Sequence, residues 1–175
     1  MEILTIKKAV PEDAQEIIDF LNSVGGETDF LTFGLNEFPI SVKEEIEIIN
    51  ECLEKENSLM LIGRMNNQIV SQLFLDVSTQ SRLAHIGHLG LSVRKSHWGK
   101  SIGKKMLTEA IHWAQKKLTK IQLQVRVDNS NAVNLYKKFN FVIEGTIINA
   151  LQVNQIYYND YVMGLNLLPQ SISIR

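Results

Sequence analysis

Hydrophobic positions recur with a helical period in the first third of the chain. A short strand is predicted over residues 4–9, and a helix follows because Pro11 suits a first helical turn. Residues 22–40 have the glycine and proline content of a loop. Ser41 and Glu44 then match a capping box, which predicts the start of a second helix. The inward faces of the two helices are expected to carry Ile17, Ile18, Phe20 and Leu21, and Ile46, Ile49 and Leu53.

The remaining two thirds of the chain change between strand and helix periods. Residues 58–65 and 68–77 flank Asn66 and Asn67, which tolerate the positive φ of a tight hairpin turn. Strict alternation over residues 121–127 predicts a strand with one apolar and one polar face. Further strands are expected at 83–93, 141–148 and 156–165, and helices at 99–117 and 131–139.

The order β-α-α-β-β-β-α-β-α-β-β predicts an α/β (α+β) fold in which helices cover a mixed sheet. We expect a mostly antiparallel sheet of roughly six to seven strands, flanked by about four helices. The 175 residues contain no internal repeat and no linker rich in proline and glycine. Residues 1–175 are therefore expected to form a single domain.

Composition narrows the class of protein. Hydrophobic residues make up 45% and charged residues 21%, as is usual in soluble globular proteins. No stretch approaches the ~20 apolar residues of a membrane span, and the N-terminus lacks the basic and apolar regions of a secretory signal. The single cysteine, Cys52, excludes an internal disulfide, and the four histidines have no close ligand spacing. We therefore expect a cytoplasmic protein with no membrane association and no metal.

The net charge of −1 is unevenly distributed. Residues 1–60 hold 14 acidic and 4 basic side chains, whereas residues 61–175 hold 5 acidic and 14 basic ones. The first part therefore suits a cationic ligand and the second an anionic one. The alternative is that solvated helix faces merely differ in sign. Nucleic-acid binding is not expected, because aromatic residues do not interleave with the basic ones.

The strand over residues 84–93 has an interrupted apolar pattern. Ile86 is at an even position and would point to one face of the strand, whereas Leu89 and the apolar residues after it are at odd positions and would point to the other. Gly87 and Gly90 bracket the change, so the pattern predicts a β-bulge that frees backbone groups for an extended ligand. The alternative is a bulge that only shapes the sheet.

A glycine turn joins this strand to the next helix. Its small residues let backbone N–H groups approach a ligand, and a helix N-terminus is a ready anion site. The helix dipole alone would favour acids there, yet Lys100, Lys104 and Lys105 occupy this end, which favours a bound phosphate or pyrophosphate. The alternative is an ordinary turn with solvated lysines.

The same turn partly mimics a nucleotide-triphosphate P-loop through Gly99-Lys100-Ser101. That motif requires a glycine five residues before Gly99, where this chain has Arg94. A P-loop is therefore disfavoured.

The segment over residues 129–141 places Tyr136 two turns into a helix that begins near Asn129. On a lone helix Tyr136 would be a packed aromatic residue. The bulged strand, the glycine turn and the Asn-x-x-Ala-x-x-Leu-Tyr helix, in this order, resemble the GCN5-related N-acetyltransferase (GNAT) superfamily, over residues 83–165. The Gly-Phe that usually ends this helix is Asn140-Phe141 here, and Asn is the next best residue for a left-handed cap.

The resemblance implies a site for acetyl-coenzyme A. The bulged strand of the family pairs with the pantetheine arm, which implicates the backbone of Leu91, Ser92 and Val93. The phosphate turn corresponds to Trp98, Gly99, Lys100, Ser101, Ile102, Gly103 and Lys104. Within it, Trp98 replaces a polar residue of the family pattern and Ser101 replaces a glycine. Asn129 would hydrogen-bond the pantetheine arm, and Tyr136 would lie beside the thioester sulfur.

Acetyl transfer to an amine requires a neutral amine, a stabilised oxyanion and a proton for the departing thiolate. Backbone N–H groups near Leu91 are expected to stabilise the oxyanion. Tyr136 is the expected general acid, and His88 the expected base because imidazole titrates near neutrality. Glu144 and Asp160 are weaker candidates for the base. The alternative for His88 is a hydrogen bond across the sheet.

Acceptor choice in the family is set by the region between the first two helices and by the last two strands. Glu27, Asp29 and Glu37 in that region suit a cationic amine, such as a polyamine, an amino sugar, an amino acid or a protein N-terminus. The acceptor itself is not specified by the sequence. We expect an acetyl-CoA-dependent N-acetyltransferase that can form a homodimer. The alternative is a non-catalytic acetyl-CoA-binding module.

Overall fold

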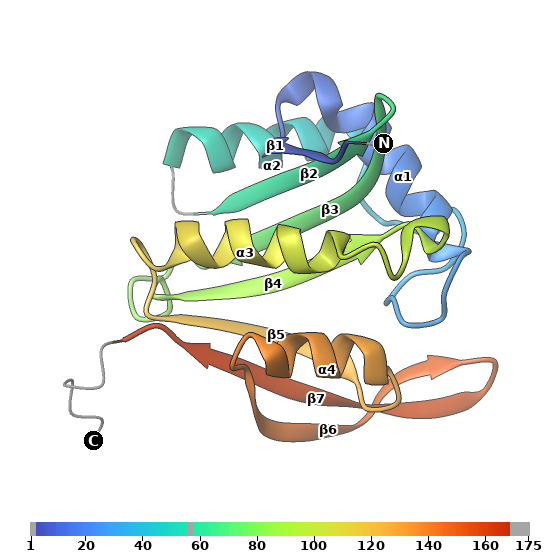
Figure 1. Cartoon of the computed structure of the whole chain (residues 1–175), viewed down its shortest axis with the longest axis vertical. Coiled ribbons are helices and arrows are strands. Elements are labelled where there is room, and N and C mark those ends of the chain that lie inside the picture. Colours follow the sequence, from blue (N-terminus) through green and yellow to red (C-terminus); the bar gives the residue numbers. More distant parts are fainter. Residues whose placement is uncertain (1–2, 56–57, 169–175) are drawn as a thin grey trace. The chain divides into compact units, whose positions relative to one another are not determined.

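The structure is a computed structural model that describes residues 3–55 and 58–168, and it contains the predicted order of elements (Figure 1). Within these residues the strands form a seven-stranded mixed sheet, as predicted, and their order in the sheet is β1-β2-β3-β4-β5-β7-β6. They are β1 (Thr5–Lys8), β2 (Leu59–Met65), β3 (Gln68–Val77), β4 (Ile86–Val93), β5 (Lys120–Arg126), β6 (Val142–Val153) and β7 (Ile156–Asn166). The helices are α1 (Ala14–Gly25), α2 (Val42–Lys55), α3 (Ile102–Ala114) and α4 (Ser130–Lys138), with short 3-10 helices η1 (Pro11–Asp13) and η2 (Lys95–His97).

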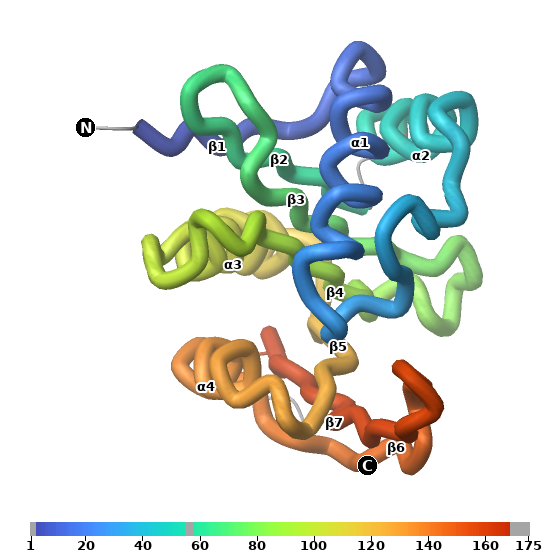
Figure 2. The backbone as a smooth tube through the Cα atoms, turned by 90° about the vertical axis from the view of Figure 1, so that its right-hand side faces the viewer, coloured from blue at the N-terminus to red at the C-terminus, as the bar shows by residue number. Residues whose placement is uncertain are grey.

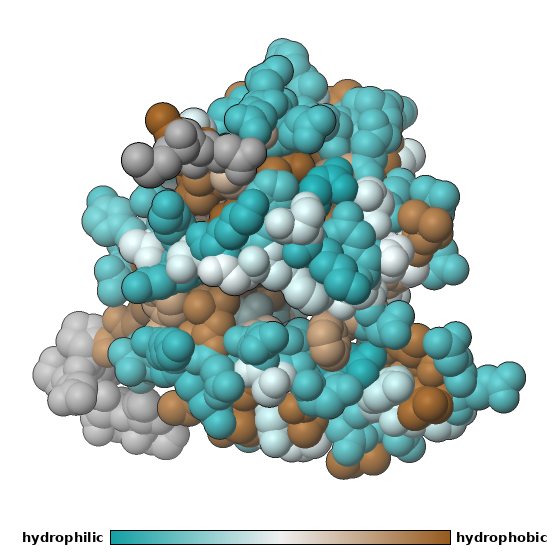
Figure 3. Space-filling view, turned by 45° about the vertical axis from the view of Figure 1, so that its right-hand side comes forward, coloured by the Kyte–Doolittle hydropathy of each residue, from teal (hydrophilic) through white to brown (hydrophobic). Residues whose placement is uncertain are grey.

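The chain divides into two compact units, each built from segments that are distant in sequence. The first unit comprises residues 1–76 and 90–110, and the second comprises residues 77–89 and 111–175. β4 and α3 therefore each contribute residues to both units. Hydrophilic residues predominate on the surface visible in Figure 3, with hydrophobic ones in small groups. No helix in the described ranges is long and apolar enough to cross a membrane.

In the first unit, α1 and α2 cover one face of β1–β3, and α3 lies on the other (Figure 2). Both strand pairs are antiparallel, and Asn66 and Asn67 form the turn between β2 and β3 with φ angles of 50° and 62°, which confirms the predicted hairpin. Gly63 faces α3, where Met106 is its neighbour. The core beneath α1 and α2 comprises Ala9, Ala14, Ile17, Phe20, Leu21, Val24, Ile49, Cys52, Met60, Ile62 and Ile69.

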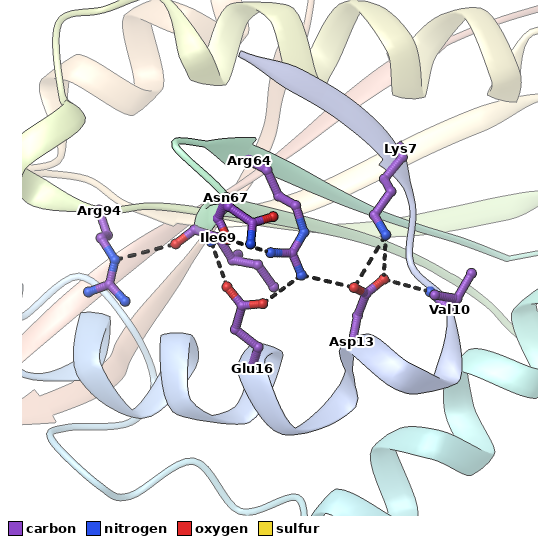
Figure 4. A network of polar contacts seen from close by, with 8 residues as sticks. All are labelled: Lys7, Val10, Asp13, Glu16, Arg64, Asn67, Ile69 and Arg94. Atoms are coloured by element: carbon purple, nitrogen blue, oxygen red, sulfur yellow. Dashed lines mark hydrogen bonds and ion pairs between the residues drawn. The ribbon is translucent and has the colours of Figure 1, made fainter. Parts of the chain in front are cut away.

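A polar network joins the start of α1 to the β2–β3 hairpin (Figure 4). Asp13, which is buried, accepts the backbone N–H of Val10 at 3.0 Å and pairs with Lys7 at 3.1 Å and Arg64 at 2.9 Å. Arg64 also pairs with Glu16 at 2.6 Å. Burial by itself would raise the pKa of Asp13, but Val10, Arg64 and Lys7 together hold it below its usual value. The network thus fixes the direction in which α1 leaves β1.

In the second unit, β5, β7 and β6 form antiparallel ladders, and β4 runs parallel to β5. α4 lies on one side of these strands (Figures 1 and 2). The predicted alternation along β5 is confirmed, because Ile121, Leu123 and Val125 are all buried. Cross-strand partners share a sheet face, so Gln122 and Arg126 lie on the opposite face with His88 and Asp160, their partners on β4 and β7.

Several local expectations need correction. The capping box of α2 is present, since Ser41 and Glu44 exchange hydrogen bonds of 2.8 Å and 3.3 Å. However, Leu53, which was expected to face inward, is 39% exposed. The neighbouring Cys52 is buried in the core in its place. Residues 22–25 continue α1 instead of starting the loop, and β4 begins at Ile86 instead of residue 83.

Candidate functional site

The turn after β4 belongs to the first unit and contains two left-handed residues. Gly99 has a φ of 75° and Ser101 a φ of 61°, and α3 begins at Ile102 immediately afterwards. A glycine adopts this conformation without steric cost, whereas a serine is strained in it. The backbone geometry therefore explains why the related family pattern has a glycine where this chain has Ser101.

The lysine side chains of the turn are exposed, whereas its tryptophan is hydrogen-bonded to β4. Lys100, Lys104 and Lys105 are exposed around the first turn of α3, as an anion site requires. The side chain of Ile102 is instead part of the core, at 3% exposure. Trp98 donates its indole N–H to the carbonyl oxygen of Val93 at 2.7 Å, so its ring lies back against the end of β4. Trp98 thus stabilises the turn and does not supply the family's polar side chain.

Arg94 and Glu27 fix the entry to this turn. Arg94 Nε donates to the carbonyl of Ile69 at 3.4 Å (Figure 4). Nη1 of the same side chain lies 2.9 Å from Ser23 Oγ and 3.2 Å from Glu27 Oε1. The second oxygen of Glu27 accepts the backbone N–H of Lys95 at 2.6 Å. The expectation that Glu27 attracts a cationic acceptor is therefore wrong, because both of its oxygens are already bound within the first unit.

A cavity of about 480 Å³ lies in the first unit beside Arg94. Its lining is Glu16, Asp19, Phe20, Gln68, Ile69, Arg94, Ser96 and His97. Glu16 is held by Arg64, and Asp19 accepts a hydrogen bond from Gln15 at 2.9 Å. The polar groups of the lining are thus largely engaged with one another and with neighbouring side chains.

Exposure alternates regularly along the middle of β4. Gly87 and Leu89 are buried, His88 and Gly90 are exposed, and Ile86 is half-buried on the face of His88. The apolar pattern therefore does not require a bulge, and the bulge stays a prediction that rests on the family resemblance. Residues 91–93, predicted to contact the pantetheine arm, are half-buried.

In the second unit, His88 lies beside a polar cluster on one face of the sheet. Its cross-strand partner Gln122 donates to Glu144 Oε2 at 3.3 Å, and Lys120 pairs with the same oxygen at 2.7 Å. Glu144 has no register partner, because it lies where the β6–β7 register shifts between Ile143 and Gly145. Its carboxylate lies against Gly164, where any side chain would collide with it. Glu144 is thus committed to Lys120 and Gln122, which makes it a poorer general base than a free carboxylate.

α4 is capped at both ends by an asparagine, of which only Asn140 was predicted as a cap. The side chain of Asn129 accepts the backbone N–H of Ala132 at 3.2 Å, as an N-cap does. At the other end Asn140 has a φ of 65°, and its N–H donates to the carbonyl of Lys137 at 3.0 Å. Phe141 donates to the carbonyl of Tyr136 at 3.1 Å, which completes a Schellman motif. The predicted left-handed cap at Asn140 is therefore confirmed.

Tyr136 is held firmly by this cap. Its side chain is 7% exposed, and its ring centroid lies 5.6 Å from that of Phe141. Burial raises the pKa of Tyr136 to about 12. The phenol is therefore protonated at neutral pH and is available as a hydrogen-bond donor, but it is a weaker acid than an exposed tyrosine.

Arg126 is a buried functional candidate that the sequence pattern does not reveal. It is 5% exposed, although alternation places it on the polar face of β5. Its guanidinium binds both oxygens of Asp128, at 2.9 Å and 2.6 Å, and stacks 3.5 Å from the centroid of Tyr158. No local signal indicates the stacking contact, because Tyr158 lies on another strand, whereas Asp128 is only two residues away in the sequence. Within the described ranges, no group of three or more His, Cys, Asp and Glu side chains is arranged to hold a metal.

Comparison with known proteins shows which family the chain matches. Residues 28–141 match the model of the acetyltransferase (GNAT) family. A crystal structure of a GNAT-family acetyltransferase from Streptococcus pneumoniae is 32% identical, with a TM-score of 0.89 over 94% of this chain and 99% of that one. A Salmonella typhimurium structure with its cofactor acetyl-CoA shares the fold at a TM-score of 0.84 and 14% identity, over 97% of this chain and 96% of that one.

A further relative carries a more specific name. L-amino acid N-acetyltransferase AaaT from Escherichia coli (strain K12) is 29% identical over 105 residues, which is 59% of this chain. The matched region spans 65% of that relative's length.

Proposed function

The chain belongs to the acetyltransferase (GNAT) family, and from this premise we propose that it transfers the acetyl group of acetyl-CoA to an amine. The observation that supports the proposal is the capped α4 helix, because its N-cap Asn129 and its buried Tyr136 are the two residues that the family resemblance assigns to acetyl-CoA. The lysine-bearing turn before α3 supports it. The name of the Escherichia coli relative favours an amino acid or a similar small amine.

We assign the pyrophosphate to the turn over residues 98–104. Its two left-handed residues, Gly99 and Ser101, shape the backbone ahead of the free N–H groups of α3, and exposed lysines add positive charge. Arg94, fixed by Glu27, holds the turn in place before the ligand arrives. Preorganisation of this kind lowers the entropic cost of binding.

Tyr136 is proposed to assist the departing thiolate. A thiol resembling cysteine has a pKa of about 8.5, so complete proton transfer from a phenol with a pKa of about 12 is uphill by about 5 kcal/mol. A hydrogen bond that strengthens as charge develops on sulfur avoids most of this cost. The buried hydroxyl therefore acts best as a donor during bond breaking rather than as an acid beforehand.

His88 is proposed to accept the proton of the acceptor ammonium, directly or through water. It is exposed, whereas the competing carboxylate of Glu144 is bound by Lys120 and Gln122. Action in the cytoplasm and assembly as a homodimer remain parts of the proposal.

The decisive experiment is a screen of acetyl-CoA turnover against a panel of amines, with thiol release as the readout. Thiol release that depends on an amine, with a matching gain of acetyl mass on that amine, is the expected result. Tight acetyl-CoA binding without turnover on any amine would instead support a non-catalytic acetyl-CoA-binding module. The departures from the family pattern at Ser101 and Trp98 are the observations that favour this alternative.

A further inference from the structure

The turn that joins β5 to α4 (Figure 1) is held by a buried guanidinium. Arg126, the last residue of β5, is 5% exposed, and its Nε and Nη2 donate to the two oxygens of Asp128 at 2.9 Å and 2.6 Å. Asp128 lies within the turn, and its side chain is 52% exposed. The hydrogen bond from Arg126 holds the pKa of Asp128 below its usual value, so the pair stays ionised at neutral pH.

Strand β7 fixes the same guanidinium from a second direction. The guanidinium carbon of Arg126 lies 3.5 Å from the centroid of the Tyr158 ring. The two strands are also joined one residue further on, because the N–H of Val127 donates to the carbonyl of Asn159 at 3.0 Å. A planar group that is stacked on its face and bound at its edge has little rotational freedom left. Arg126 therefore links β7 firmly to Asp128.

Asn129 directly follows this pair, and its side chain is positioned by the turn. The N–H of Asn129 donates to the carbonyl of Arg126 at 3.0 Å, and the N–H of Ser130 donates to the carbonyl of Asp128 at 2.9 Å. Oδ1 of Asn129 is used by the N-cap bond from Ala132. The Nδ2 group is therefore the part of this side chain that can donate to a carbonyl of the pantetheine arm.

A buried guanidinium is an unusual way to hold a turn that backbone hydrogen bonds already close. Burial removes the hydration of the charge, and an ion pair compensates for this only with good geometry. A lysine would neutralise Asp128, but it could not bind both carboxylate oxygens while stacked on Tyr158. The buried Arg126 is best explained by a need for precision at the residue that follows the turn.

We propose that Arg126 is a positioning residue that acts through Asp128 to hold Asn129 in the orientation that binds acetyl-CoA. The inference rests on the proposed function, in which Asn129 contacts the cosubstrate. Tyr136 is held by the cap at the other end of α4, so the pair should govern the affinity for acetyl-CoA and not kcat.

The test measures acetyl-CoA affinity by calorimetric titration, and kcat at saturating acetyl-CoA, in Asp128→Ala, Arg126→Lys and the double variant. Asp128→Ala removes an exposed side chain, and Arg126→Lys keeps the buried charge. Each single variant should raise the Kd for acetyl-CoA by about fivefold to tenfold and change kcat by less than about twofold. Because both substitutions break one linkage, the double variant should bind no more weakly than the weaker single variant.

A loss in the double variant near the product of the two single losses would overturn the inference, because Arg126 would then act independently of Asp128. Unchanged affinity in either single variant would also overturn it. A fall in kcat as large as the loss of affinity would show that the pair supports the whole helix and not Asn129 alone, and would refute the positioning role.

Leu118→Ala is the matched control for stability. Leu118 is 7% exposed, and it precedes the opposite end of β5 in the same unit as Arg126. Its truncation should lower Tm at least as much as Asp128→Ala does, while the affinity for acetyl-CoA stays native. An equal loss of affinity in this control would show that binding follows stability, which contradicts the proposed role.

Amide hydrogen exchange at Ala132 reports on the capping bond of Asn129 without any ligand. Exchange there should be faster in Asp128→Ala and Arg126→Lys than in native protein, whereas exchange at Phe141 in the other cap should not change. Native exchange at Ala132 in both variants would show that the pair does not hold Asn129.

The outcomes separate this inference from the proposed function. If the variants lose affinity as expected but native protein releases no thiol with any amine, the proposed transfer fails and the positioning role of Arg126 stands. If thiol is released and both variants bind acetyl-CoA as native protein does, only the positioning role fails. Native protein without affinity for acetyl-CoA would refute both.

Discussion

Replacement of Tyr136 by phenylalanine removes one hydroxyl group and leaves the packing of α4 intact. The ring remains 7% exposed and keeps its contact with Phe141, whose backbone N–H closes the helix. The free energy of unfolding is therefore expected to change by less than about 1 kcal/mol. The substitution thus isolates the contribution of the phenol to catalysis.

The magnitude follows from the bond that the hydroxyl is proposed to donate. A hydrogen bond to a charged group contributes ~1.5–3 kcal/mol, which corresponds to a rate factor of about 10 to 150. Because the pKa of Tyr136 is about 12, the phenol stays protonated across the working pH range, and the loss should not depend on pH below ~9. We expect kcat to fall by about 10²-fold, with acetyl-CoA affinity nearly unchanged.

Steady-state thiol release gives kcat, and calorimetry gives the affinity for acetyl-CoA. Tyr157→Phe, which removes a hydroxyl from a residue that is 61% exposed, is the matched control and should retain native rates. A fall in kcat smaller than about threefold would refute the reasoning and make Tyr136 a packing residue. An equal fall in affinity and rate would show that the hydroxyl binds the cosubstrate uniformly.

Four further substitutions test other parts of the molecule. Ser101→Gly should raise Tm, because glycine relieves ~1 kcal/mol of left-handed strain, and a lower Tm would show that the serine side chain stabilises the turn. Lys100→Glu should weaken acetyl-CoA binding, more so at low salt, and a loss independent of salt would argue against a phosphate contact. His88→Gln should shift the rise of kcat/KM with pH toward the pKa of the amine, whereas an unchanged profile with lower stability would indicate a structural histidine. Burial raises the pKa of Glu45 to about 7, so its ionisation at higher pH should destabilise the fold by up to about 3 kcal/mol. Glu45→Gln should therefore raise Tm at alkaline pH but not near pH ~5, and a uniform change would contradict this origin.

Short-range patterns in the sequence predicted most of the local structure correctly. The Asn66–Asn67 turn, the capping box of α2 and the left-handed cap at Asn140 each depend on residues within a few positions of one another. Propensity and hydrogen bonding act at that range, so such signals survive in any fold. The interrupted apolar pattern does not by itself require a bulge between Gly87 and Gly90, because a half-buried Ile86 on the polar face explains the same pattern.

The sequence by itself determined the order of elements, the caps, the lysine-bearing turn and the positions of Asn129 and Tyr136. Only the tertiary structure decided the burial, the hydrogen-bond partners and the pKa values of the side chains. Glu27 is bound by Arg94, 67 residues away, and is unavailable to a cationic acceptor. Arg126 stacks on Tyr158 of another strand, Oδ1 of Asp160 is buried with no hydrogen-bond partner among the described residues, and burial raises the pKa of Tyr136. Desolvation and pairing depend on neighbours brought together by the fold, and no local pattern in the chain encodes them.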